Sequence, residues 1–356
     1  MKILFVTDLY PIDTGETNTP QTLHNFVKEW IKLGHEVDVI KPNFLFNSFL
    51  RGKKFYKTGF YKFDGVKVFN ANYWTPFCLN VAQKIPKEID LKSYDMIIAH
   101  MPSGIISANK LGLEGSLVCG AHASDIEVLT NPIYGFYFKK QLENAYRKAN
   151  KIACRSHVLQ KKFNALMPDC AEKTFVAPSG VIINNEHEGS KTPLSVLTCA
   201  NLIKRKNIDK LILAVNDLQG FELKIIGDGK ELKNLKKIAS SNVEFLGRLP
   251  HEKVLEEMQK SDIFILPSVN ETFGMVYLEA MASGCITVCT KNDGIDGIIK
   301  DGENGFLTEP TAEGIQETLL RIKDSNLEKI RQSSLETIKQ YTPENCAKNY
   351  LDNIFS

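Results

Sequence analysis

The sequence lacks the cysteine spacing of a metal-binding or disulfide-stabilised domain. Its 8 cysteines are scattered over 356 residues, and no two are spaced as Cys-x-x-Cys. Cys285 and Cys289 fall in the apolar run GCITVC, where cysteine serves as a small buried hydrophobe. We therefore expect neither a zinc site nor a disulfide framework in this chain.

Long hydrophobic runs and an excess of one charge are also absent. No segment approaches the ~20 apolar residues that a membrane-spanning helix needs, and the opening MKILFVTDLYP predicts a buried strand rather than a signal peptide. The net charge of +2 argues against a nucleic-acid-binding surface and against disorder. We expect a cytoplasmic protein, at most peripheral at the inner face of the membrane, with no nucleic-acid partner.

The sequence does contain an alternation of short apolar runs and amphipathic stretches, which is typical of parallel α/β sheets. Its length suits two domains, and the polar stretch INNEHEGSKTP (183–193) reads as a linker between two Rossmann-like halves. The predicted strands are 2–8, 36–42, 66–72, 95–100, 116–122, 151–156, 174–180, 194–202, 221–227, 243–247, 262–267, 285–290 and 305–309. The predicted helices include one from Thr19-Pro20 to Gly34, those at 206–218, 230–240, 251–260 and 275–283, and a last one begun by Thr342 and Pro343.

Two carboxylates flank the junction between a predicted strand and a predicted helix, in PSVNETFGMVYLEAMASG. Ligands of open α/β sheets bind beyond the carboxyl ends of the strands, and a helix beginning near Gly274 offers free N–H groups to an anion. One of the two carboxylates can then bind sugar hydroxyls near the reacting carbon, and the other can hold a ribose diol. The alternative is that Glu271 only favours the helix N-terminus and that Glu279 is solvated.

The same segment resembles the Glu-x7-Glu signature of the retaining family 4 glycosyltransferases, which have the GT-B fold. Other segments resemble that family in the same order, and the likeness is strongest over 194–310. These segments are VLTCANLIKRKNIDKLILA, KIIGDGKELKNLKKIA, VEFLGRLPHEKVLEEMQKSDIFILPS and GIIKDGENGFLTEP.

The resemblance implies an α/β protein with two Rossmann-like domains facing a central cleft. The acceptor-side domain would span 1–182 and the linker 183–193. The nucleotide-sugar domain would span 194–338, and a C-terminal helix, 339–356, would cross back to the first domain.

The resemblance also implies roles for single residues of the second domain. Glu271 would contact the donor sugar, Glu279 the ribose, and Lys206 would neutralise the diphosphate leaving group. The remaining donor-side residues would be Arg248 beside the base, Gly227 in a Gly-Asp-Gly turn near the nucleotide, and Phe273, Gly274, Met275 and Val276, whose backbone N–H groups would meet sugar and phosphate.

One position departs from the family. Where its members usually carry Arg, in Gly-Arg-Leu, this chain has Asn201, which brings no charge. Either Arg205 or Lys204 supplies that charge, or the diphosphate is bound more weakly. The Lys-Arg-Lys run also fits the exposed, charged start of a helix. Cations at a helix N-terminus interact unfavourably with the helix dipole, however, unless an anion binds there.

The first half resembles the family more loosely. Gly15, in the loop YPIDTGETNTP, would touch the diphosphate, although one glycine also fits an ordinary turn. His122, in CGAHASDIE, would face the donor sugar and support charge near the anomeric carbon. Asp125 and Ser156 are weaker candidates for contacts with the acceptor or with phosphate.

Residues 41–63 combine 6 Lys or Arg with many aromatics and no acid. This composition suits an anionic membrane surface, a lipid-diphosphate acceptor or an acceptor sugar. The alternative is a loop that covers the first sheet, with its aromatics buried and its lysines solvated.

The expected function is transfer of a hexosyl or N-acetylhexosaminyl group, with retention, from a nucleotide-sugar to an acceptor hydroxyl. No Asp-x-Asp motif occurs, and the resemblance implies a metal-independent reaction without a further cofactor. UDP-sugar is the favoured donor, and GDP is not excluded. The acceptor would be a glycan, a lipid-linked glycan, a protein or a small molecule, in polysaccharide, glycolipid or glycoprotein synthesis. The alternatives are an epimerase or phosphorylase of similar architecture, and a non-catalytic nucleotide-sugar-binding subunit.

Overall fold

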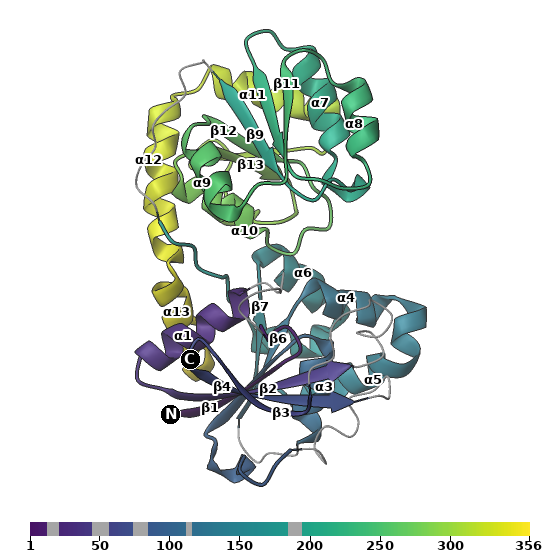
Figure 1. Cartoon of the computed structure of the whole chain (residues 1–356), viewed down its shortest axis with the longest axis vertical. Helices are drawn as coiled ribbons and strands as arrows, with labels where there is room; N and C mark the ends of the chain where they lie inside the picture. Colours follow the sequence, from purple (N-terminus) through teal and green to yellow (C-terminus); the bar gives the residue numbers. More distant parts are fainter. Residues whose placement is uncertain (13–20, 45–56, 74–84, 112–115, 184–193) are drawn as a thin grey trace. The chain divides into compact units, whose positions relative to one another are not determined.

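The computed structural model describes residues 1–12, 21–44, 57–73, 85–111, 116–183 and 194–356, which form two compact α/β units (Figure 1). The first unit comprises Met1–Arg155, Leu159–Ser179 and Pro343–Ser356, and the second comprises Ser156–Val158 and Gly180–Thr342. The last residues of the chain therefore fold with the first unit. Most of the predicted linker, 184–193, lies outside the described residues.

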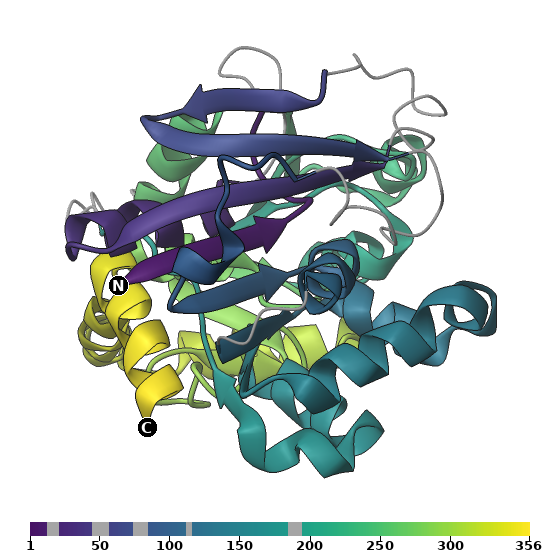
Figure 2. The same ribbon diagram turned by 90° about the horizontal axis from the view of Figure 1, so that it is seen from below.

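The first unit is built on an eight-stranded sheet in the order β3-β4-β2-β1-β5-β6-β7-β8 (Figure 2). Ile3 of the central strand pairs with Val37 on one side and with Met96 on the other, both in parallel register. The strands are β1 (Lys2–Thr7), β2 (Glu36–Phe44), β3 (Gly59–Phe63), β4 (Val66–Tyr73), β5 (Met96–His100), β6 (Ser116–Ala121), β7 (Lys151–Cys154) and β8 (Thr174–Val176).

In the described part of this unit, six helices and two short 3-10 turns accompany the strands. Among them, α13 packs beside α1, as Figures 1 and 2 both show. The helices are α1 (Thr22–Lys32), α3 (Pro102–Lys110), α4 (Ala123–Thr130), α5 (Pro132–Lys148), α6 (His157–Leu166) and α13 (Pro343–Phe355), and the turns are η3 (Leu91–Ser93) and η4 (Pro168–Lys173).

Aromatic packing holds α13 on the first unit. The rings of Trp30 and Phe26 lie 5.3 Å and 5.4 Å from that of Tyr350, centroid to centroid. The indole of Trp30 donates a hydrogen bond to the carbonyl of Ala347 over 3.0 Å. Because Trp30 and Tyr350 are almost completely buried, this helix completes the core of the first unit.

The second unit has a six-stranded parallel sheet in the order β11-β10-β9-β12-β13-β14. The strand order reverses between β9 and β12, and such a switch point is where open α/β sheets bind ligands. The strands are β9 (Ser195–Cys199), β10 (Glu222–Ile226), β11 (Val243–Gly247), β12 (Ile263–Leu266), β13 (Ile286–Thr290) and β14 (Phe306–Thr308).

Helices follow each strand from β9 to β12, and two more, α11 and α12, follow β14. They are α7 (Ile208–Asn216), α8 (Leu232–Ile238), α9 (His251–Gln259), α10 (Met275–Ala282), α11 (Ala312–Lys323) and α12 (Leu327–Ile338), with the 3-10 turns η5 (Lys204–Lys206) and η6 (Lys339–Tyr341). Within the described residues, no helix combines the length and the apolar character needed to span a bilayer.

The strands predicted from the sequence are all present, with ends shifted by a few residues. The alternative that 41–63 is a single loop covering the first sheet is wrong at both ends of this stretch. Residues up to Phe44 continue β2, and β3 forms an antiparallel edge strand against β4. Lys41 is buried rather than solvated, and its ammonium donates to the carbonyls of Asp8 and Tyr10. The middle of the stretch, 45–56, lies outside the described residues.

The last helix begins at Pro343, as the sequence predicts, and not at 339, as the family resemblance implied. Residues 339–341 form the turn η6, and α13 begins afresh at Pro343, because proline fits the first helical position but cannot continue a helix. The expected start of the first helix at Thr19-Pro20 lies outside the described residues, which show α1 from Thr22.

Replacing Tyr350 by alanine should lower the free energy of unfolding by about 3–5 kcal/mol, the usual cost of removing a buried aromatic ring. Phe355, on the same helix, is 63% exposed. Phe355→Ala should therefore change the free energy of unfolding by less than about 0.5 kcal/mol. Urea unfolding followed by circular dichroism measures both. Equal losses would contradict the role of Tyr350 in this core.

Candidate functional site

One buried tyrosine holds the loop between β12 and α10 in place. The hydroxyl of Tyr277 donates to the carbonyl of Leu266 over 2.7 Å and lies 3.1 Å from the hydroxyl of Ser268. The loop ends at Gly274, which has φ +78° and caps α10. A Cβ at Gly274 would lie 2.6 Å from the ring of Tyr277, so only glycine fits this turn into the helix.

The Lys-Arg-Lys turn η5 is tied to the same loop. Asn207 ends the turn in the left-handed conformation, and its side-chain amide donates to the carbonyl of Pro267 over 2.9 Å. The N–H of Val269 donates to the carbonyl of Arg205 over 2.8 Å. These bonds connect the segment after β9 to the segment after β12, across the point where the strand order reverses.

Two cations converge on one oxygen of Glu271. Lys206 Nζ lies 2.5 Å from Glu271 Oε2, and Arg205 Nη1 lies 3.4 Å from the same atom. The side chains of Lys206 and Glu271 are 11% and 14% exposed, whereas that of Arg205 is 44% exposed. The backbone N–H of Glu271 points to the carboxylate of Asp293, 3.0 Å and 3.1 Å from its two oxygens. Glu271 is therefore held through both its backbone and its side chain.

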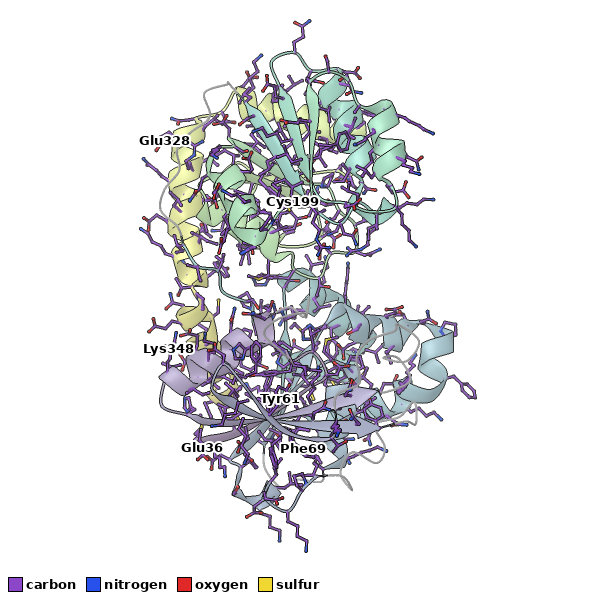
Figure 3. The ribbon with its side chains drawn as sticks, in the orientation of Figure 1. Glu36, Tyr61, Phe69, Cys199, Glu328 and Lys348 are labelled. Atoms are coloured by element: carbon purple, nitrogen blue, oxygen red, sulfur yellow. The ribbon has the colours of Figure 1, made fainter. Side chains whose placement is uncertain are left out.

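The second carboxylate lies in the second turn of α10. Glu279 Oε1 lies 3.0 Å from His251 Nε2, at the first residue of α9. Cys199 lies at the carboxyl end of β9 (Figure 3), where the charges of Glu279 and Lys206 both affect the pKa of its thiol. Burial, together with the nearby Glu279 carboxylate, raises the pKa of its thiol to about 11, although the charge of Lys206 opposes the rise.

The turn after β9 packs closely against the turn after β10. A Cβ on Gly227 would lie 1.9 Å from the carbonyl oxygen of Ala200, and a Cβ on Gly229 would lie 2.4 Å from that of Leu202. The same Cβ on Gly229 would lie 2.8 Å from the side-chain oxygen of Asn201. The Gly-Asp-Gly sequence therefore reflects backbone contact between two turns at the carboxyl edge of the sheet.

The other predicted donor residues lie at or near this edge. Arg248 is exposed directly after β11, and Phe273 is buried in the loop before α10. Met275 and Val276 open α10, where N–H groups have no acceptor within the helix. The structure thus gathers at one sheet edge Asn201, Arg205, Lys206, Gly227, Arg248, Glu271, Phe273, Gly274, Met275, Val276 and Glu279.

Ser156 is the one predicted acceptor residue that contacts this loop. It is almost completely buried, and its hydroxyl donates to the carbonyl of Thr272 over 2.8 Å. Residues 156–158 are grouped with the second unit. Gly15, the predicted phosphate contact of the first half, lies outside the described residues.

His122 and Asp125 belong to the first unit, where they cap α4. Asp125 accepts hydrogen bonds from the N–H of His122 and from the hydroxyl of Tyr146, each over 2.9 Å, and it is fully buried. Burial raises the pKa of Asp125 to about 7. With both oxygens engaged, Asp125 serves the helix start and presents no oxygen to an acceptor in this arrangement.

The ring of His122 lies in a short chain of polar groups. Its Nε2 is 2.9 Å from His100 Nδ1, and His100 Nε2 is 3.0 Å from the hydroxyl of Tyr350. Burial, helped by the charge of Arg155, lowers the pKa of His122 to about 3. The imidazole is therefore neutral at pH 7, with one nitrogen as donor and one as acceptor.

Comparison with known families gives two matches, which together span most of the chain. Residues 182–341 match the family described as glycosyl transferases group 1, and residues 20–185 match glycosyltransferase family 4. The chain belongs to these family 4 glycosyltransferases.

Individual relatives support the assignment. The chain is 32% identical over 238 residues to an uncharacterized glycosyltransferase of Methanocaldococcus jannaschii, covering 64% of this chain and 65% of that protein, slightly less than two thirds of its length. It is 23% identical to the N-acetyl-alpha-D-glucosaminyl L-malate synthase of Bacillus anthracis, over 85% of this chain and 84% of the relative. A crystal structure of Anabaena HepE in complex with UDP superposes with a TM-score of 0.73 at 18% identity, covering 100% of both chains. The architecture is thus the GT-B fold of these enzymes.

Three residues of the site are missing from the sequence-based prediction. His251, Asp293 and Tyr277 hold Glu279, Glu271 and the loop, respectively. Tyr277 falls within the quoted Glu-x7-Glu segment, and its position inside a buried helix is a usable signal. Nothing in the sequence couples His251 to the carboxylate of Glu279, or Asp293 to the backbone N–H of Glu271, because each pair is more than 20 residues apart.

Gly274→Ala should lower the free energy of unfolding by about 3 kcal/mol, because it adds both backbone strain and a clash with Tyr277. Gly302 is a matched control in the same unit, since its φ is +77° and an added Cβ would meet no described atom within 4 Å. Gly302→Ala should cost only about 1 kcal/mol. Thermal or urea unfolding compares them, and equal costs would contradict the steric argument.

The depressed pKa of His122 predicts a pH dependence. The unfolded chain protonates this histidine near its ordinary pKa of about 6.5, but the folded protein does not until about pH 3. Stability that is present above pH 6.5 is therefore lost as the pH falls towards the folded pKa. His122→Asn, which keeps a good helix cap, should reduce the proton uptake on unfolding at pH 5 by close to one proton. Unfolding measured between pH 7.5 and 4.5 tests this, and an unchanged slope would contradict it.

Proposed function

We propose that this protein transfers a hexosyl or N-acetylhexosaminyl group from a nucleotide-sugar to an acceptor hydroxyl, with retention of anomeric configuration. The observation that carries the proposal is the meeting of Lys206 and Arg205 on Glu271, in the loop that leads into the N-terminus of α10. Cationic side chains and free backbone N–H groups that lie close together can bind a diphosphate. The neighbouring carboxylates suit the hydroxyls of a sugar and a ribose.

In this proposal the diphosphate lies against the first N–H groups of α10 and against Lys206. Charge develops on the diphosphate as the glycosidic bond breaks, and a preorganised cation stabilises it there. Phosphate oxygens would take the place that Glu271 Oε2 holds on Lys206, which frees the carboxylate for the donor sugar. Glu279 holds the ribose, and Arg248 flanks the base.

The charge missing at Asn201 is assigned to Arg205 rather than to Lys204. Arg205 already reaches the oxygen that Lys206 binds, and its carbonyl is fixed by the N–H of Val269. Lys204 is exposed at the start of the turn, and neither an ion pair nor a hydrogen bond links it to Glu271 within the described residues. Two cations then serve the diphosphate, and the reaction is proposed to need no metal.

UDP-sugar is the proposed donor. Support comes from the Anabaena structure, which is a complex with UDP, and from the relative that is named as an N-acetyl-alpha-D-glucosaminyl L-malate synthase. The proposed acceptor is a glycan, lipid-linked or protein-linked, and His122 and Ser156 remain proposed contacts of sugar and acceptor. The proposal also places the protein in the cytoplasm, where residues 41–63 would contact an anionic membrane; Lys41 is excluded from that role because it is buried.

A non-catalytic nucleotide-sugar-binding subunit is the second candidate. The uncharged Asn201 favours it, since the family usually has Arg there. Against it stands the arrangement around Glu271, whose backbone and side chain are both fixed. Loss of turnover in Glu271→Gln with nucleotide affinity retained favours the enzyme, and turnover equal to the wild type removes Glu271 from the mechanism.

Calorimetric titration with UDP, GDP and ADP, first without metal and then with Mg²⁺, tests the proposal. Lys206→Ala should weaken binding of the preferred nucleotide by roughly 2–4 kcal/mol, the scale of a lost charged partner. Arg205→Ala should weaken it less, because this side chain is more exposed, and Lys204→Ala serves as the adjacent control with little effect. Equal affinity in Lys204→Ala and Arg205→Ala would contradict the assignment of Arg205. No binding of any of the three nucleotides by the wild type would overturn the proposed function.

A further inference from the structure

Glu279 is held by a residue from another helix. His251 opens α9 and Glu279 lies on α10, and the Nε2–Oε1 distance between them is 3.0 Å. Because a carboxylate only accepts hydrogen bonds, the imidazole Nε2–H must be the donor. The side chain of His251 is 65% exposed and that of Glu279 is 18% exposed, so the pair lies at the surface edge of the site.

The second oxygen of Glu279 is left open. In the part of the chain that the structure describes, His251 supplies the one hydrogen bond to this carboxylate, and it goes to Oε1. Burial and the Glu279 charge raise the pKa of the Cys199 thiol, so this thiol stays protonated at neutral pH. Oε2 is therefore free to accept a hydrogen bond from a ligand.

We propose that His251 is a positioning residue for Glu279, and that the pair sets a preference for ribonucleotide over 2′-deoxyribonucleotide donors. This inference rests on the proposed function, in which Glu279 receives the ribose. His251 restrains the long side chain before the ligand arrives, so less conformational freedom is lost on binding. A 2′-deoxyribose lacks one of the two ribose hydroxyls, so the positioned carboxylate loses the hydrogen bond that this hydroxyl would donate.

The test compares each of UDP, GDP and ADP with its 2′-deoxy analogue by titration calorimetry at constant ionic strength. For the nucleotide that binds, the wild type should prefer the ribose form by about tenfold or more, the scale of one hydrogen bond to a charged group. Glu279→Ala should reduce this preference to near unity, and His251→Ala to about threefold or less. His251→Gln, which keeps an N–H donor, should retain most of the preference.

Lys253→Ala is the matched control. Lys253 lies on α9 two residues from His251 and pairs with Glu256, 2.7 Å away, instead of with the site. Its removal should leave the preference unchanged. A purely structural role for His251 at the start of α9 would lower the melting temperature but would weaken both forms of the nucleotide equally.

The outcomes separate the two proposals. If the wild type prefers ribose and His251→Ala keeps that full preference, the role of His251 is overturned while the transferase proposal stands. If the wild type binds ribose and deoxyribose forms equally, both the ribose role of Glu279 and the inference on His251 are overturned. If no nucleotide binds, the failure lies with the proposed function. Circular dichroism of each variant confirms that it is folded, as the exposure of His251 leads us to expect.

Discussion

The ion pair between Lys206 and Glu271 is the contact on which the candidate site depends. Both side chains are largely shielded from water, and each charge alone would be costly to bury. The pair is supported by the Asp293 carboxylate, which accepts the N–H of Glu271, and by the bonds that join η5 to the loop after β12. In the proposed reaction a diphosphate would bind the same lysine, so Glu271 already pairs with the cation that the ligand would use.

Much of this site follows from the sequence because parallel strands place their carboxyl ends at one edge. Lys206 and Glu271 are 65 residues apart, yet β9 and β12 are neighbours at the switch point. The strand–helix pattern placed Glu271 at this edge, and the family resemblance added Lys206; the strand order explains why the two meet. His251 could not be found in this way, because its contact depends on the directions of two side chains on separate helices rather than on a strand end.

The first unit was harder to predict for two physical reasons. Its edge strand β3 is rich in aromatics and lysine, and an edge strand needs no continuous apolar run because one side lacks a neighbouring strand. Asp125 looked like an acceptor contact, but a carboxylate three residues after His122 also satisfies the N–H groups at a helix start. A sequence pattern alone does not distinguish a polar group used by the fold from one used by a ligand.

The position of α13 has a consequence for biosynthesis. Residues 343–356 complete the core of the first unit, but the ribosome makes them after the entire second unit. Until they emerge, Trp30 and Phe26 lack the aromatic partner that Tyr350 provides. The second unit can close its sheet before residues 343–356 are made, whereas the first unit exposes the apolar surface of Trp30 and Phe26 until then, and surface of this kind favours aggregation.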